Sequence, residues 1–182
     1  MDHELNRILS DNYLDGLTDR SVPALRSLRS ECQEVETKLS YLRRLVQGRH
    51  DIVAGEMERR SGGGDPDDVH GLVERLPEIL SDRVRGPGPG RGLPSTIETE
   101  EPTGALVDRL DAIVDAVALD APSSAPDASL AEAEGQLAAL EAEVSSLRRS
   151  VFDRLDAVET ELTGRYRDGS ARVDDLLVDR VD

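Results

Sequence analysis

The longest helical pattern in the chain covers residues 21–60, SVPALRSLRSECQEVETKLSYLRRLVQGRHDIVAGEMERR. Apolar side chains recur in it every three or four residues, at Leu25, Leu28, Cys32, Val35, Leu39, Leu42 and Val46. This spacing predicts an amphipathic helix with one apolar seam. Ser21 is a favourable N-cap, Pro23 suits the first turn, and Ser61 followed by three glycines predicts the end. We therefore expect one long helix over residues 21–60.

A second stretch, residues 129–164, repeats this pattern. Its seam consists of Leu130, Ala133, Leu137, Leu140, Val144, Leu147, Val151 and Val158. Each of the two helices has an apolar stripe that needs a partner, and few other segments are long enough to cover either one. We therefore expect the two long helices to pack against each other.

The remaining segments predict shorter elements. We expect an amphipathic helix in residues 1–20, between about Leu5 and Leu17, and a weak C-terminal helix in residues 165–182. Between the long helices, residues 61–128 predict a linker region with two short helices, and the Gly- and Pro-rich residues 85–95 within it predict flexibility. The expected fold class is all-α: an antiparallel two-helix coiled-coil hairpin with short accessory helices and a flexible Gly/Pro linker.

Composition limits the classes of function. The chain has 182 residues, one Phe, three Tyr and no Trp, which favours a thin helical seam over a large globular core. A net charge of -16 disfavours direct nucleic-acid binding and favours a basic protein partner. The single cysteine, Cys32, predicts a buried, reduced thiol and a cytoplasmic location. No apolar run approaches the roughly 20 residues of a membrane span, so we expect no membrane association and no signal peptide.

The sequence also predicts that the protein is not an enzyme. The three histidines, His3, His50 and His70, lack metal-ligand spacing, so we expect no metal site. Glu36 and Asp51 would lie about four helical turns apart, too far to share a reacting atom. We identify no catalytic residues.

A polar repeat at an offset of 105 residues is the strongest functional signal. Residues 36–51 match residues 141–156 at eight positions: Glu36, Ser40, Leu42, Arg43, Arg44, Val46, Arg49 and Asp51. The second copy carries Glu141, Ser145, Arg148 and Asp156, and has Phe152 where the first has Gln47. A coiled coil repeats its apolar positions and lets its outer face vary. Repetition of an acid, a hydroxyl and a guanidinium therefore suggests a shared ligand.

The geometry of the repeat favours an antiparallel pair. At 3.6 residues per turn, the five polar residues of the first copy fall within an arc of roughly 80°, over about 22 Å. The centre of this stripe lies about 110° from the apolar seam, so it flanks the helix contact. Parallel helices would place the two stripes on opposite faces of the pair. Antiparallel helices would place both beside one shared groove.

The chemistry of the repeat suits guanine. A carboxylate can accept from N1–H and the exocyclic amine of guanine, and Arg can donate to O6 and N7 or to phosphate. A ligand with guanine, phosphate and its own two-fold symmetry would fit such a pseudo-symmetric surface. Cyclic di-GMP has all three.

The spacing Glu-x3-Ser-x2-Arg-x3-Gln-x3-Asp resembles the signature of the RsiG family of cyclic di-GMP-responsive anti-sigma factors. It is complete in the first copy, and the second departs from it at Phe152, which would either stack on a base or simply pack. The resemblance implies that the chain binds a dimer of cyclic di-GMP, two nucleotides per chain, between the two motifs. It also implies that the chain, with the nucleotide, sequesters a WhiG-type flagellar-class sigma factor from RNA polymerase and represses sporulation genes.

Two plainer interpretations stay open. The stripes could be solvated flanks of a coiled coil, and the chain would then be a ligand-independent helical scaffold or adaptor that binds partner helices. Arg44 and Arg149, which directly follow Arg43 and Arg148 in the sequence, also repeat. They would either neutralise neighbouring acids or bind phosphate. We rank these two arginines as secondary candidates for the ligand site.

Overall fold

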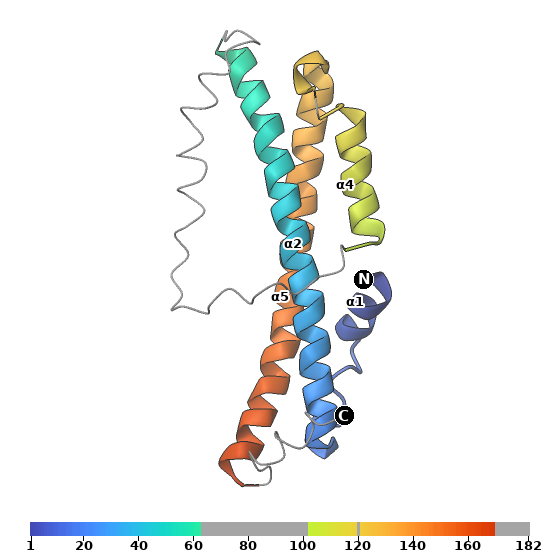
Figure 1. Cartoon of the computed structure of the whole chain (residues 1–182), viewed down its shortest axis with the longest axis vertical. Helices are drawn as coiled ribbons and strands as arrows, with labels where there is room; N and C mark the ends of the chain where they lie inside the picture. The colour runs from blue at the N-terminus through green and yellow to red at the C-terminus, as the bar shows by residue number, and fades with distance from the viewer. Residues whose placement is uncertain (63–101, 120, 170–182) are drawn as a thin grey trace, which may run out of the picture.

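The computed structural model describes residues 1–62, 102–119 and 121–169 (Figure 1). Its elements, in chain order, are α1 (Asp2–Leu9), η1 (Leu17–Asp19), α2 (Val22–Ser61), α4 (Ala105–Ala116), η2 (Pro122–Ser124) and α5 (Asp127–Arg167). This confirms the all-α prediction, and no strand occurs within the described ranges. Most of the predicted linker region, including the Gly/Pro linker at 85–95, lies outside the described residues, as do residues 170–182 of the C-terminal helix predicted over 165–182.

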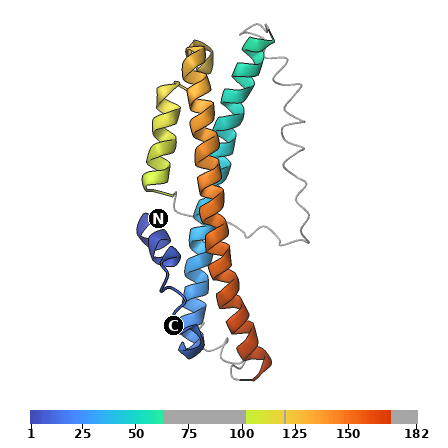
Figure 2. The same ribbon diagram turned by 180° about the vertical axis from the view of Figure 1, so that it is seen from behind.

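Helices α2 and α5 form an antiparallel hairpin. They run side by side over their whole length (Figures 1 and 2). At one end, Arg26 near the start of α2 donates to the Tyr166 hydroxyl near the end of α5, at 2.6 Å. At the other end, Arg60 near the end of α2 pairs with Asp127 at the start of α5. These contacts confirm the hairpin and its predicted direction.

The two predicted seams meet in the core of this hairpin. Most of their side chains are fully buried, including Val35, Leu39, Leu42 and Val46 on α2 and Leu137, Leu140, Val144 and Val151 on α5. Leu28 and Leu147 are only partly buried. Because burial of an apolar side chain yields roughly 1.5–3 kcal/mol, this thin seam supplies most of the stability of the pair.

Two helix ends differ from their predicted positions. Ser21 caps α2 as expected, since its side chain accepts from the Ala24 amide at 3.4 Å. Helix α5 was predicted to fray from Gly164, but it continues to Arg167, because Leu162 and Tyr166 pack against the start of α2. Helix α1 ends at Leu9 instead of near Leu17, because Ser10 bonds back to the Arg7 carbonyl and a series of turns follows.

The short helices α1 and α4 lie in a row on one side of the hairpin (Figures 1 and 2). Helix α1 buries Leu5 and Ile8, and α4 buries Leu106, Leu110 and Ile113. Ion pairs fix the two helices to the hairpin on this side. Glu4 of α1 accepts from Lys38 of α2 at 3.4 Å, and Arg109 of α4 donates to Glu143 of α5 at 2.6 Å.

The offset of 105 residues relates more than the motifs. It carries η1 (Leu17–Asp19) onto η2 (Pro122–Ser124), and the first residue of α2 onto the first residue of α5. It also carries Leu5 and Ile8, the buried residues of α1, onto Leu110 and Ile113, two of the three buried residues of α4. The described chain therefore consists of two equivalent units, α1-η1-α2 and α4-η2-α5, related by a pseudo-two-fold axis. The sequence predicted the repeat of the long helices and of the motif, but not that of the short elements.

At each end of the hairpin, an arginine of one unit donates hydrogen bonds to backbone carbonyls of the other unit. Arg60 donates to the carbonyls of Pro122 and Ser123 in η2, and its Nε bonds Glu56 at 2.7 Å. Arg165 is the equivalent residue in the second unit. It donates to the carbonyls of Leu17, Thr18 and Arg20, in and beside η1, and its Nε bonds Glu161 at 2.7 Å. We call these two networks the end clamps.

The predicted buried thiol is also present. Cys32 is free and fully buried, and the Tyr13 hydroxyl lies 3.3 Å from its Sγ. Burial raises the pKa of the Cys32 thiol, although the hydrogen bond with Tyr13 opposes this. In the described part of the chain, no helix is both long enough and apolar enough to cross a membrane.

The hydrogen bonds of Glu56 in the first end clamp predict a contribution to stability that is lost at low pH. Arg59 donates to this carboxylate at 2.6 and 2.8 Å, and Arg60 also donates to it. Hydrogen bonds from Arg59 first, and then from Arg60, lower the pKa of Glu56 from 4.5 to about 2. A lowered pKa contributes stability that is present above pH 4.5 and is lost as the pH falls through about 2.

We therefore expect Glu56→Gln to lower the free energy of unfolding by about 1 kcal/mol at neutral pH. The difference from the wild type should shrink as the pH falls from 4.5 towards 2. Urea unfolding followed by circular dichroism at several pH values measures it. Asp153→Asn, at an exposed position of α5, is the control. A difference for Glu56→Gln that does not change with pH would contradict this role.

Candidate functional site

The repeated polar residues lie on the face of the hairpin opposite α1 and α4. Lys38 marks the α1 side of α2, because it bonds Glu4. The motif residues of α2, Glu36 to Asp51, are turned by roughly 140° to 180° from Lys38 around the helix axis. The second copy has the same relation to Glu143, which marks the α4 side of α5. We call this surface the motif face.

One cluster on the motif face is centred on Glu141 of α5. Its Oε1 accepts from Arg43 Nε at 2.8 Å, from Gln47 Nε2 at 3.3 Å and from Ser145 Oγ at 3.0 Å. Arg43 and Gln47 come from α2, so this carboxylate joins the two motif copies. The hydrogen bond from Arg43 is the largest cause that lowers the pKa of Glu141, and Ser145 and Gln47 add to it. Glu141 is therefore held as an anion.

A second cluster, centred on Glu36 of α2, mirrors the first. Glu36 Oε1 accepts from Ser40 Oγ at 2.6 Å and from Arg148 Nη1 at 3.4 Å. The offset of 105 carries each member of this cluster onto a member of the other. Each glutamate is thus bonded by the serine of its own helix and the arginine of the opposite helix. The structure brings together seven of the predicted site residues: Glu36, Ser40, Arg43, Gln47, Glu141, Ser145 and Arg148.

These ion pairs remain accessible to solvent. The exposed fraction of the side chain ranges from 19% for Glu36 to 35% for Arg43. Ion pairs that are exposed to this extent contribute little to stability, because water screens them and competes for the same groups. Arg43 and Arg148 can therefore exchange their glutamate partners for a ligand at modest cost.

The two clusters differ at one position. Gln47 donates to Glu141, whereas its counterpart Phe152 cannot donate to Glu36. The Phe152 ring instead lies below the Arg148 guanidinium, whose central carbon is 5.3 Å from the ring centroid. Phe152 is 36% exposed, so it is a surface residue of the motif face and is not part of the core.

The remaining candidates lie at the margins of this face. Asp51 and Asp156 are exposed, about one helical turn beyond Gln47 and Phe152. The secondary candidates Arg44 and Arg149 are also exposed. The cross-helix pairs were not foreseen from the sequence, because they depend on the register between α2 and α5. The contact between Arg148 and Phe152 was missed for another reason: it depends on side-chain rotamers, although their spacing of four residues on one helix is compatible with it.

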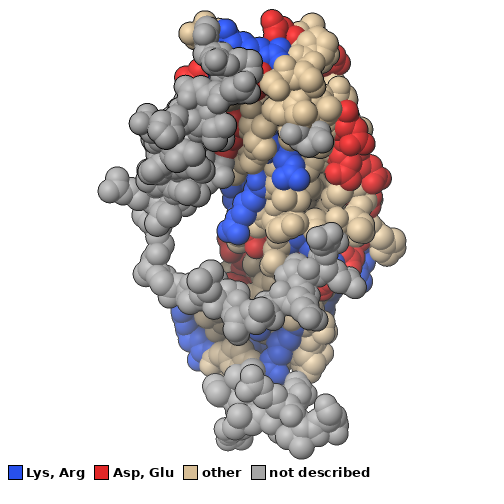
Figure 3. All heavy atoms as spheres, turned by 45° about the horizontal axis from the view of Figure 1, so that its top comes forward, with Lys and Arg blue, Asp and Glu red and all other residues tan. Residues whose placement is uncertain are grey.

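Surface charge is mixed in sign on the face seen in Figure 3. Basic and acidic side chains are interspersed there, with a concentration of acids along the upper right edge. The described residues visible on this face form no continuous basic stripe of the kind that tracks a nucleic-acid backbone. Among the described residues, no group of three or more His, Cys, Asp or Glu side chains could hold a metal ion.

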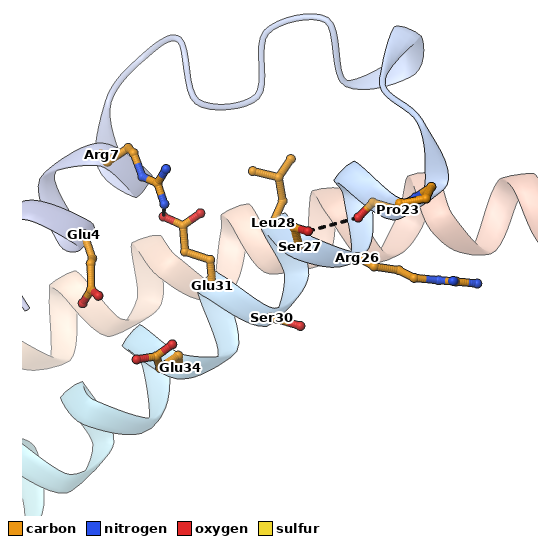
Figure 4. Close-up of a pocket in the computed structure, with 9 residues that line it drawn as sticks. All are labelled: Glu4, Arg7, Pro23, Arg26, Ser27, Leu28, Ser30, Glu31 and Glu34. Carbon is orange, nitrogen blue, oxygen red and sulfur yellow. Dashed lines mark hydrogen bonds and ion pairs between the residues drawn. The ribbon is translucent and has the colours of Figure 1, made fainter. Parts of the chain in front are cut away.

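A cavity of about 740 Å³ lies away from the motif face, between α1 and the first half of α2 (Figure 4). Its charged side chains are Glu4, Arg7, Arg26, Glu31 and Glu34. Arg7 pairs with Glu31, and Lys38 bonds both Glu4 and Glu34. These acids are already paired, and no motif residue lines the cavity. We therefore place the candidate site on the motif face.

Comparison with protein families identifies a class for this arrangement. A family model described as RsiG-like matches residues 11–80, a region that contains α2 and the first motif copy. Over this region the chain is similar to the RsiG family. RsiG-like proteins are regulatory anti-sigma factors and not enzymes. The second copy, residues 141–156, lies beyond the matched region. A comparison with curated proteins gave no match.

Proposed function

We propose that this chain is an anti-sigma factor that binds a dimer of cyclic di-GMP on its motif face. With the nucleotide bound, it sequesters a WhiG-type flagellar-class sigma factor from RNA polymerase and represses sporulation genes. This activity would place the protein in the cytoplasm. The observation that carries the proposal is the pairing of two Glu-Ser-Arg clusters across the hairpin, related by a pseudo-two-fold axis.

The clusters supply the groups that guanine requires. Glu36 and Glu141 can each accept from N1–H and the exocyclic amine of one guanine. Arg43 and Arg148, once released from the glutamates, can donate to guanine O6 and N7 or to phosphate. Two equivalent clusters on one face match a ligand that presents two equivalent ends. The cross-helix pairs already hold all four side chains in place, which lowers the ordering cost of binding.

The nucleotide would act as part of the interface with the sigma factor. Helices α1 and α4 occupy the opposite side of the hairpin, so among the described elements neither one covers the motif face. A nucleotide bound there would present its outer surface to a partner. Linkage then requires reciprocity: nucleotide that tightens sigma-factor binding must itself bind more tightly when the sigma factor is present.

A calorimetric titration of the full chain with cyclic di-GMP tests the proposal. We expect binding of two nucleotides per chain, tighter when a flagellar-class sigma factor is present. Cyclic di-AMP is the matched control, because adenine lacks both the N1–H and the 2-amino group that a carboxylate accepts. Equal heats for the two dinucleotides, with and without the sigma factor, would reject the proposal and favour the ligand-independent adaptor.

A further inference from the structure

Phe152 gives the two halves of the motif face different chemistry. It is the only phenylalanine in the chain, and it stands where the first copy has Gln47. Its ring is 36% exposed and lies below the Arg148 guanidinium at 5.3 Å. A guanidinium over an aromatic ring forms a flat, cationic surface. The Gln47 half has no such surface, because Gln47 bonds Glu141 instead.

Arg148 is only partly satisfied by protein groups. Its Nη1 reaches Glu36 at 3.4 Å, which is long for a charge-assisted hydrogen bond. Its Nε is buried and has no hydrogen-bond partner among the described residues. The equivalent Arg43 differs, since its Nε donates to Glu141 at 2.8 Å. Arg148 is thus held by one long hydrogen bond and by its contact with the Phe152 ring, whereas Arg43 is held by a short charge-assisted bond.

The Glu36 carboxylate accepts fewer hydrogen bonds from the protein than the Glu141 carboxylate. It accepts from two protein donors, and one of these bonds is long. Glu141 accepts from three donors. A guanine that binds Glu36 therefore has fewer protein hydrogen-bond donors to displace than one that binds Glu141. The same half of the face also carries the exposed ring and the oriented guanidinium.

We propose that Phe152 and Arg148 form a stacking platform for one guanine of the ligand, so that the half-site at Glu36 binds first and more tightly than the half-site at Glu141. This inference rests on the proposed cyclic di-GMP site and specifies how its two halves differ. At this half-site, stacking of the base on the platform takes the place of the hydrogen bond that Gln47 donates in the other half. Of the two roles that the sequence left open for Phe152, stacking and packing, the proposal selects stacking.

Substitutions at Phe152 separate stacking from packing. Phe152→Leu keeps an apolar side chain and removes the flat ring, and we expect the first binding step for cyclic di-GMP to weaken by about 10-fold. Phe152→Tyr keeps the ring and should retain wild-type affinity. Tyr41→Leu is the matched control, because Tyr41 is 42% exposed but lies about 120° around α2 from the centre of the motif stripe. It should bind as the wild type does.

A direct signal comes from the single phenylalanine. Fluorinated phenylalanine would give one resonance, which we expect to shift at the first equivalent of cyclic di-GMP through the ring current of the stacked base. If wild-type protein binds the nucleotide, but the resonance does not move and Phe152→Leu binds equally well, the platform is rejected while the cyclic di-GMP site stands. If wild-type protein does not bind cyclic di-GMP, the proposed function itself fails.

Discussion

Replacing both Arg43 and Arg148 with alanine is expected to weaken cyclic di-GMP binding at least about 30-fold. Each arginine is expected to supply one bidentate contact to guanine or phosphate, and such contacts contribute roughly 1–3 kcal/mol each. The double substitution removes one from each half of the motif face. Calorimetry with the full chain measures the affinity, and circular dichroism checks that the helices remain. Loss of the two partly exposed ion pairs should cost little stability.

The matched control removes two arginine–glutamate pairs from the opposite face. Arg7→Ala with Arg109→Ala breaks the pairs with Glu31 and Glu143 and causes the same change in net charge. Nucleotide affinity should then change little. A further double variant, Arg44→Ala with Arg149→Ala, tests the secondary candidates. If Arg43→Ala with Arg148→Ala keeps wild-type affinity in a folded chain, these two residues do not belong to the site.

Leu39→Ala is expected to lower the free energy of unfolding by about 2–5 kcal/mol. Leu39 is fully buried in the seam between α2 and α5, and its truncation leaves a cavity that the helices cannot fill by relaxing. A single thin seam has few other contacts to compensate for the loss. Urea denaturation followed by circular dichroism measures the change.

Ile52→Ala is the control for this core substitution. Ile52 is 46% exposed on the same helix, so we expect a loss below about 1 kcal/mol. Equal effects of the two substitutions would show that the seam does not stabilise the hairpin. The pair also discriminates between functions: if Leu39→Ala impairs binding to the sigma factor in a chain that remains folded, and the arginine substitutions have no effect on it, the adaptor interpretation gains support.

The hairpin could be predicted from the sequence because its signals are local and periodic. The seam from Leu25 to Val46 predicts one helix, the matching seam from Leu130 predicts the other, and the repeated stripe predicts their direction. The end of α5 was predicted less well. Gly164 is a poor helix former, but the tertiary contacts of Leu162 and Tyr166 outweigh its preference.

The candidate site was predicted in its residues but not in its bonds. Repetition of Glu36, Ser40 and Arg43 singled out the right type of side chain without showing which arginine meets which glutamate. That pairing depends on the axial register of two helices joined by a long intervening segment, which periodicity leaves undetermined. The repeat of the short elements was missed because η1 and η2 share no identical residue. Their equivalence is evident in backbone conformation and in the positions of Arg60 and Arg165.

The end clamps make the local stability of each unit depend on the other. Arg60 of the first unit holds a turn of the second, and Arg165 of the second holds a turn of the first. Loss of either arginine would therefore loosen a turn of the opposite unit before it affects its own. The clamps are alike in the two units, whereas the motif face between them differs at Gln47 and Phe152.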